Sequence, residues 1–317
     1  MKKEFLIGRS FGMLAALACI LLAGCNNGTE AQKPASPQAS NADEDETGGP
    51  STASSTSTDA GAQADDSEPL QLTSAQGEDA PEGNWGSLRG RFLYDGTAPK
   101  PEAIVPTKDV EFCGQHNLVD QSLVVNEEGQ LANVFVFVYV PRGQKLEVHE
   151  SYEETAEEPV VLDNNHCAFE PHCLVMRTSQ PLSVKNSDPV GHNTNVPNQF
   201  NLIVPSGNAL EHTFQTAQTY PLPVACNIHP WMKSHLLIRE DPYATLSGGD
   251  GTFEIKNIPA GEHEFVFWHE RPGNLGNLAA GKVKTDRRGR MKINIPAGMV
   301  VDLGDIEIPA DSLKERY

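Results

Sequence analysis

The chain has 317 residues, a formal net charge of −19 and 7% aromatic residues. It contains no basic stretch interleaved with aromatic side chains, which argues against nucleic acid as a partner. The acidic charge is concentrated between Asn26 and Asn84, where twelve acidic side chains stand against one base, Lys33. This stretch carries −11 of the −19, so the rest of the chain is only mildly acidic.

The first residues have the features of an export signal. A positively charged start is followed by an apolar run at 11–23, which is too short for a lasting membrane span. The run ends in the letters LAGC at Cys25, and this ending resembles the lipobox of bacterial lipoproteins. The resemblance implies a signal peptide at 1–24 and a lipid on the Cys25 thiol. We therefore expect a membrane-anchored protein of the cell envelope, periplasmic or on the cell surface. A plain secretory signal with an incidental cysteine is the alternative.

The stretch 25–84 is predicted to be a disordered linker. Ser, Thr, Ala, Gly and acidic residues dominate it, and large apolar side chains are almost absent. Such a sequence cannot bury enough surface to offset the entropy lost on ordering. Some 60 flexible residues would reach roughly 40 Å, enough to let a domain search the space above a membrane.

From residue 85 onward the sequence predicts an all-β protein, either sandwich or barrel. Short runs rich in β-branched and aromatic residues alternate with Gly, Pro, Asn or Asp, and no segment has a helical apolar period of useful length. The expected strands lie at 88–94, 131–141, 174–184, 235–239, 252–255, 264–268 and 291–295. Strands this short and evenly spaced are typical of sandwiches and small barrels.

A strand–turn–strand pattern near the end suggests a second domain. The letters DGTFEI at 250–255 are followed by IPAGE at 258–262. This pattern resembles the carboxypeptidase-regulatory-like and carbohydrate-binding-like modules, which are Ig-like β-sandwiches. The resemblance implies a sandwich split into 85–144 and 241–317, with 145–240 inserted between the halves. A tandem of two domains is the alternative layout.

The inserted segment carries donors suited to a metal ion. The loop 226–232 reads CNIHPWM, so that Cys226, His229 and Met232 recur at three-residue spacing and can face one metal. Upstream, His192 would close the site from another strand pair. A copper ion that passes single electrons prefers a thiolate, two imidazoles and a long, weak thioether. Zinc is a poorer match, because methionine is a poor zinc ligand.

The run 171–238 resembles the type 1 blue copper proteins, or cupredoxins, and most closely amicyanin and plastocyanin. Their pattern is a strand, then H-N, then C-x-x-H-P-x-M before a last strand. The resemblance implies a Greek-key β-barrel with one type 1 copper. The four implied ligands are His192, Cys226, His229 and Met232. In the same pattern Asn193 ties the two ligand loops together and Pro230 stiffens the second loop.

The sequence departs from this family in two places. Pro221 and Pro223 interrupt the strand that leads into the loop, and proline cannot donate to a β-ladder, so we expect this strand at an edge or a bend. Trp231 replaces a smaller group and could supply an apolar docking surface. Two other interpretations stay open: Cys226 as half of a disulfide, and copper storage or delivery without electron transfer.

The remaining cysteines and histidines are less informative. Cys113 and Cys167 lie in polar, turn-like contexts and could form a disulfide, which would leave Cys173 as a buried free thiol. A Cys167–Cys173 disulfide is the alternative. His166 and His172 could form a second metal pair, although histidines in strands are more often structural.

No catalytic motif is present in the sequence, so we expect a protein that is not an enzyme. The predicted function is electron transfer between redox partner proteins. The alternative is an envelope-anchored module whose outer sandwich binds a glycan or another protein.

Overall fold

A computed structural model describes residues 71–74 and 81–314. The predicted signal peptide, Cys25 and most of the predicted linker lie outside the described residues. Inside the predicted linker, β1 (Gln71–Ser74) instead pairs with β20 (Met299–Pro309). Among the described residues, no helix has the length and apolar character needed to span a membrane.

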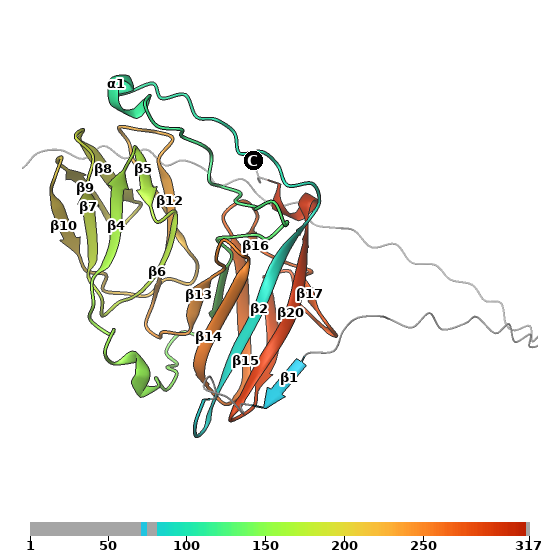
Figure 1. The fold of residues 1–317 in the computed structure, drawn as a ribbon. Coiled ribbons are helices and arrows are strands. Elements are labelled where there is room, and N and C mark those ends of the chain that lie inside the picture. Colours follow the sequence, from blue (N-terminus) through green and yellow to red (C-terminus); the bar gives the residue numbers. More distant parts are fainter. Residues whose placement is uncertain (1–70, 75–80, 315–317) are drawn as a thin grey trace, which may run out of the picture. The chain divides into compact units, whose positions relative to one another are not determined.

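The described chain is almost entirely β-structure, in agreement with the prediction (Figure 1). One sandwich contains a sheet in the order β1-β20-β2-β14 and a sheet in the order β13-β3-β15-β16, with β19 also paired to β15. The further bounds are β2 Trp85–Asp95, β3 Phe135–Val138, β13 Ala244–Leu246, β14 Thr252–Pro259, β15 Gly261–His269, β16 Gly273–Asn274 and β19 Arg290–Ile295. A small ribbon is made of β17 Ala279–Ala280 and β18 Val283–Lys284.

Alternation along the strands builds the core of this sandwich. Phe253 and Ile255 of β14 are buried, whereas Glu254 between them is exposed, because successive side chains of a strand point to opposite faces. Met291 and Ile293 of β19 reach the same core from the other sheet. The two sheets therefore enclose one apolar layer.

The second sandwich is formed by the strands from β4 to β12. Its sheets have the orders β10-β7-β4-β5 and β6-β12-β11-β8-β9. The bounds are β4 Val160–Asn165, β5 Ala168–Glu170, β6 Cys173–Arg177, β7 Leu182–Asn186, β8 His192–Val196, β9 Phe200–Val204, β10 Ala209–His212, β11 Leu222–Ala225 and β12 Lys233–Arg239. Leu162 and Val184 of one sheet share a buried core with Leu236 and Ile238 of the other.

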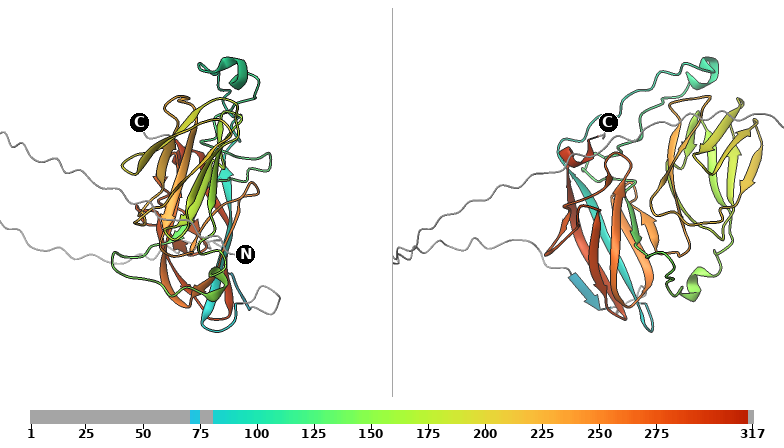
Figure 2. Two further views of the ribbon diagram at one scale, coloured as in Figure 1. Left: turned by 90° about the vertical axis from the view of Figure 1, so that its left-hand side faces the viewer. Right: turned by 180° about the vertical axis from the view of Figure 1, so that it is seen from behind.

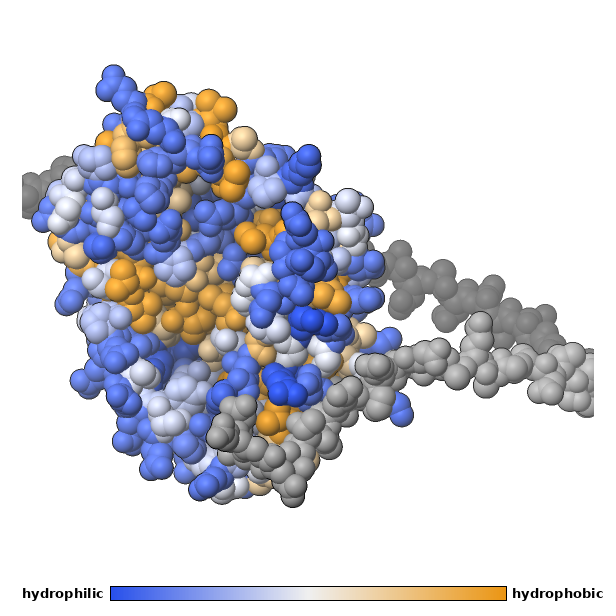
Figure 3. Space-filling model, in the orientation of Figure 1, coloured by the Kyte–Doolittle hydropathy of each residue, from blue (hydrophilic) through white to orange (hydrophobic). Residues whose placement is uncertain are grey.

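In the chain, the second sandwich lies between β3 and β13. The first sandwich is therefore built from strands that precede the second in sequence and strands that follow it (Figure 2). Strand β3 reads FVFV and all four residues are buried. Val136 and Val138 face the core of the first sandwich, whereas Phe135 and Phe137 pack in a cluster with Leu237 of β12. Burial on both faces explains the unbroken apolar run. Figure 3 shows hydrophobic residues gathered between the two sandwiches on the face drawn there.

Helical structure is short: α1 spans Val110–Cys113, η1 Glu150–Tyr152 and η2 Ala310–Leu313. Helix α1 lies at the tip of a segment, 96–122, which we call the arm. Backbone hydrogen bonds from Ile104 N to Leu118 O and from Asp120 N to Glu102 O, 2.9 and 2.8 Å, pair its two sides. A disulfide between Cys113 and Cys167 joins the arm to the turn between β4 and β5.

Strand β11 contains one of the two prolines, Pro223, and does not lie at an edge of its sheet, which was one of the two expected positions. Strand β11 lies between β12 and β8, but its pairing with β8 is limited to Ala225 and Asn195. Pro223 is paired with His235 of β12 only. The missing proline N–H therefore falls where the ladder to β8 has already ended, which makes an interior position tolerable.

Candidate metal centre

The predicted ligands lie at the ends of neighbouring strands in the sheet β6-β12-β11-β8-β9 of the second sandwich. His192 opens β8, and the loop from Cys226 to Met232 joins β11 to β12. Two backbone hydrogen bonds close this loop, Cys226 N to Met232 O at 3.2 Å and Met232 N to His229 O at 2.9 Å. The loop is thus a tight turn clamped between two paired strands, which restricts where its side chains can point.

The structure brings three of the four predicted ligands into one cluster. His192, Cys226 and His229 each offer a donor atom within 4.8 Å of the others, and all three are buried. Cys226 Sγ lies 3.7 Å from His229 Nδ1, and the two imidazole centroids are 4.5 Å apart. Met232 is 1% exposed and packs in the same core cluster as Cys226.

Both imidazoles are held from behind by a carboxylate. His192 Nε2 lies 2.8 Å from Asp188 Oδ2, and His229 Nε2 lies 2.8 Å from Asp109 Oδ2. The Nδ1 atoms of both rings therefore remain available to a metal ion. His192 Nδ1 is buried and has no hydrogen-bond partner in the described part of the chain. A carboxylate behind each imidazole is the usual support of a metal-binding histidine. The donors therefore suit a soft or borderline metal ion, copper included.

The side chain of Asn193 connects the start of β8 to the loop that follows Cys226. Its Oδ1 accepts hydrogen bonds from the backbone N–H of Asn227 at 2.6 Å and of Ile228 at 3.3 Å. The same atom lies 3.5 Å from Cys226 Sγ. One amide therefore fixes the start of the loop, and with it the position of the thiol.

The cluster favours a charged pair when no metal is bound. Burial opposes protonation of His192, but its hydrogen bond to Asp188 and the nearby Cys226 outweigh burial and raise the pKa of His192 to about 9. Burial likewise opposes the Cys226 thiolate, yet the two neighbouring histidines stabilise it and lower the pKa of Cys226 to about 6. At neutral pH the thiol is thus prepared as a thiolate, the form that binds metals.

The arm covers the outer edge of His229. Asp109 stands directly before α1, and the Cys113–Cys167 disulfide fastens the arm next to it. The His229 side chain is 0% exposed, whereas the Asp109 carboxyl that it contacts is 42% exposed. His229 is therefore connected to solvent through a hydrogen bond to a half-exposed carboxylate.

The sequence analysis assigned no supporting role to either carboxylate. Asp188 precedes His192 by four residues, and that spacing was the available signal. Asp109 is 120 residues from His229, and nothing in the sequence connects the two.

The structure also describes the other cysteine, tryptophan and histidine residues that the sequence analysis named. Cys173 is a buried free thiol. Trp231 is half-buried and donates through Nε1 to the carbonyl of Cys167 at 3.0 Å. His166 and His172 are not paired. His166 lies against His116, with ring centroids 4.7 Å apart, and His172 contacts Glu270.

No protein-family model and no curated protein sequence matches the chain. Several solved copper proteins are similar to part of it. Purple cupredoxin from Nitrosopumilus maritimus is 19% identical over 26% of this chain and 99% of its own, with a TM-score of 0.23. An oxidised amicyanin variant is 19% identical over 26% of this chain and 82% of its own, with a TM-score of 0.23. The copper-containing nitrite reductase from Thermus scotoductus SA-01 is 20% identical over 32% of this chain and 25% of its own, with a TM-score of 0.24. At this level of likeness, the matches identify no residue's role.

Proposed function

We propose that the second sandwich is a cupredoxin domain that holds one copper ion and passes single electrons between redox partner proteins. The observation that carries this proposal is the buried cluster of one thiol and two imidazoles, with both outer nitrogens bonded to carboxylates. His192, Cys226, His229 and Met232 would hold the ion. When bound, copper would supply a one-electron couple.

The residues around the cluster suit electron transfer better than turnover of a substrate. Four protein donors leave no open position for a substrate, so we propose that this site is not an enzyme's. The Asn193 and Asp188 hydrogen bonds hold two of the donors in place before any metal arrives, which limits rearrangement between oxidation states. The exposed carboxylate of Asp109 offers a short bonded path from His229 to the surface.

A visible absorption spectrum of the chain carrying Cys173→Ser, titrated with Cu(II), tests this proposal, because that background leaves Cys226 as the only free thiol among the described residues. We expect an intense thiolate-to-copper band that saturates at one equivalent and is bleached by a reductant. Copper bound without reversible bleaching would favour storage or delivery. No band, with Cys226 found in a disulfide, would leave a β-sandwich binding module.

Copper uptake should strengthen as the pH rises. Between about pH 6 and pH 9 the metal-free site holds a Cys226 thiolate beside a His192 imidazolium. Binding there displaces the His192 proton, so the association constant should rise about tenfold per pH unit. Below pH 6 the Cys226 proton must leave as well, and the slope should approach about a hundredfold per unit. Calorimetry in buffers of different ionisation heat counts the protons that are released on binding. An association constant for copper that does not change with pH would contradict this account.

We also propose that the protein works in the cell envelope, held to a membrane by a lipid on Cys25. Two observations support this: the lipobox-like sequence, and the Cys113–Cys167 disulfide, since disulfides persist in oxidising compartments. If this anchor exists, Cys25→Ser should release the protein from the membrane fraction. Equal membrane retention of the wild-type and Cys25→Ser chains would rule out the lipid anchor.

A further inference from the structure

We propose that His172, Cys173, His235 and Glu270 form a second metal site, for a divalent cation such as zinc. Each of these residues offers one donor atom, and the four atoms all lie within 4.8 Å of one another. None of them belongs to the copper cluster described above. The site would join the two sandwiches, because its donors come from both.

Strand pairing and the packing of the two sandwiches bring the donors together. Cys173 of β6 and His235 of β12 are direct partners in a parallel pair, so their side chains point to the same face of the sheet. The backbone N–H of His235 donates to the carbonyl of His172 at 3.1 Å, which fixes His172 beside them. Glu270 follows β15 of the other sandwich, 98 residues from His172 in the chain.

The Glu270 carboxylate faces both imidazoles. Its Oε1 lies 2.5 Å from His172 Nε2, and its Oε2 lies 3.5 Å from His235 Nδ1. All four side chains are largely shielded from water: the exposed fractions are 9% for His172, 7% for Glu270 and 15% for His235, and residue Cys173 is 4% exposed.

A hydrogen-bonded clamp between the sandwiches would explain only part of this arrangement. The contact of His172 with Glu270 satisfies one imidazole nitrogen and one carboxylate oxygen. However, His235 Nδ1 is buried without a hydrogen-bond partner in the described part of the chain. The buried Cys173 thiol also stands in a group of polar donors rather than in a wholly apolar pocket. Both features are explained if the four donors converge on an ion.

The donor set matches zinc chemistry. Two imidazoles, a thiolate and a carboxylate are all ordinary zinc ligands, and four of them complete a tetrahedral site. A Cys173 thiolate and the Glu270 carboxylate together balance the charge of a divalent cation. The Cys173 proton would be released on binding, and no electron is transferred.

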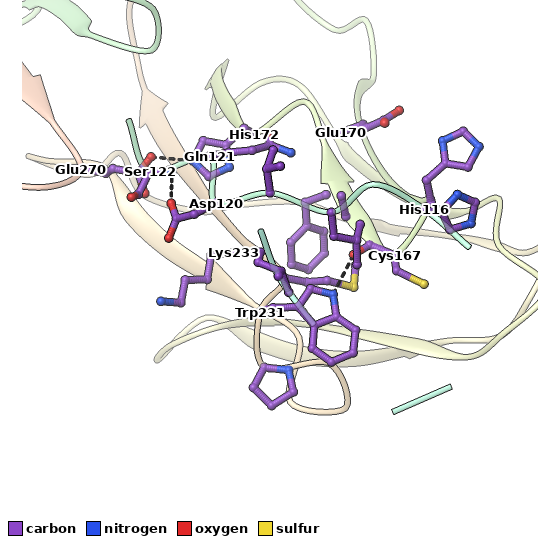
Figure 4. Close-up of a pocket in the computed structure, with 18 of the residues that line it drawn as sticks. His116, Asp120, Gln121, Ser122, Cys167, Glu170, His172, Trp231, Lys233 and Glu270 are labelled. Carbon is purple, nitrogen blue, oxygen red and sulfur yellow. Dashed lines mark hydrogen bonds and ion pairs between the residues drawn. The ribbon is translucent and has the colours of Figure 1, made fainter. Parts of the chain in front are cut away.

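A cation can reach the cluster from a cavity of about 720 Å³. His172, His235 and Glu270 line its wall, together with Asp120 of the arm and Lys233 of β12. Figure 4 shows Glu270 and Asp120 at one end of the cavity. Entry therefore does not require the sandwiches to separate.

Cobalt(II) titration of the full chain carrying Cys226→Ser tests the second site, because that background removes the copper site's thiolate and isolates this proposal from the first. We expect absorption bands of tetrahedral cobalt and a thiolate-to-cobalt band, saturating at one equivalent and abolished by excess zinc. Adding Cys173→Ser should remove the thiolate band. Adding Glu270→Gln should weaken binding on the order of 100-fold.

Glu262→Gln is the matched control, because Glu262 is on β15, the strand that Glu270 follows, but its side chain is 64% exposed. It should leave the cobalt titration unchanged. The proposal is overturned if the Cys226→Ser chain shows no thiolate-to-cobalt band. It is equally overturned if Cys173→Ser and Glu270→Gln titrate like the Glu262→Gln control, in which case the cluster is a hydrogen-bonded contact between sandwiches.

Discussion

In a chain that already carries Cys173→Ser, Cys226→Ser will remove the intense thiolate-to-copper band, and the affinity for Cu(II) will fall by more than about 100-fold. Replacing groups that only support metal ligands already costs about 10- to 100-fold, and here the thiolate itself is removed. The fold should persist, because serine is close in size to cysteine and its hydroxyl can still donate to Asn193 Oδ1, which lies 3.5 Å from Sγ. Visible absorption and metal analysis measure the loss, and circular dichroism checks the fold.

Met232→Leu is the companion variant to Cys226→Ser. Because a thioether is only a weak axial donor, this chain should keep both copper and colour, with a higher reduction potential. Complete loss of copper from the Met232→Leu chain would refute the axial role of Met232. A colour that survives in the chain carrying both Cys173→Ser and Cys226→Ser would refute the thiolate assignment.

The second large effect is expected at Asp188. Its carboxylate accepts from His192 Nε2 at 2.8 Å and from the backbone N–H groups of His166 and Cys167 at 2.6 and 2.8 Å. Its side chain is 1% exposed, so Asp188→Ala leaves two buried donors, on His192 and Cys167, and the part-buried N–H of His166 without their acceptor. We expect the free energy of unfolding to fall by about 3 kcal/mol or more. Copper affinity should also fall about 10- to 100-fold, since His192 loses its orientation.

Urea unfolding of the metal-free chain measures the first effect of Asp188→Ala, and copper titration measures the second. Glu211→Gln is a suitable control, because Glu211 is an exposed acid on β10 of the same sandwich. Its unfolding free energy should stay within about 0.5 kcal/mol of the wild-type value. A similarly small change for Asp188→Ala would show that the carboxylate does not support the site.

The two metal clusters lie on the same sheet but take their donors from different parts of the protein. Met232 precedes β12 and His235 lies three residues further along the chain, a span of about 10 Å in an extended strand. The first cluster draws its donors from one sandwich, whereas the second also needs Glu270 from the other. Separating the sandwiches should therefore disrupt the second cluster and leave the donors of the first on their own strands.

Much of the protein could be read from local sequence. Short β-branched runs between turn residues predicted an all-β protein, because strand formation depends largely on local composition and on alternation. The loop 226–232 places Cys226, His229 and Met232 within seven residues, so a tight turn alone brings them near one another. The run at 131–141 also predicted a strand, although not that both faces of β3 would be buried.

Other features depend on how distant segments pack. Pro221 and Pro223 suggested a strand at an edge or a bend, but whether a proline is tolerated depends on where the ladder from β11 to β8 ends. The contact between Asp109 and His229 arises because the arm returns over the site and is joined by a disulfide to the turn after β4. The cluster around Glu270 requires two sandwiches to meet. Local composition determines strands and turns, but a contact across about 100 residues depends on tertiary packing, which a single sequence does not display.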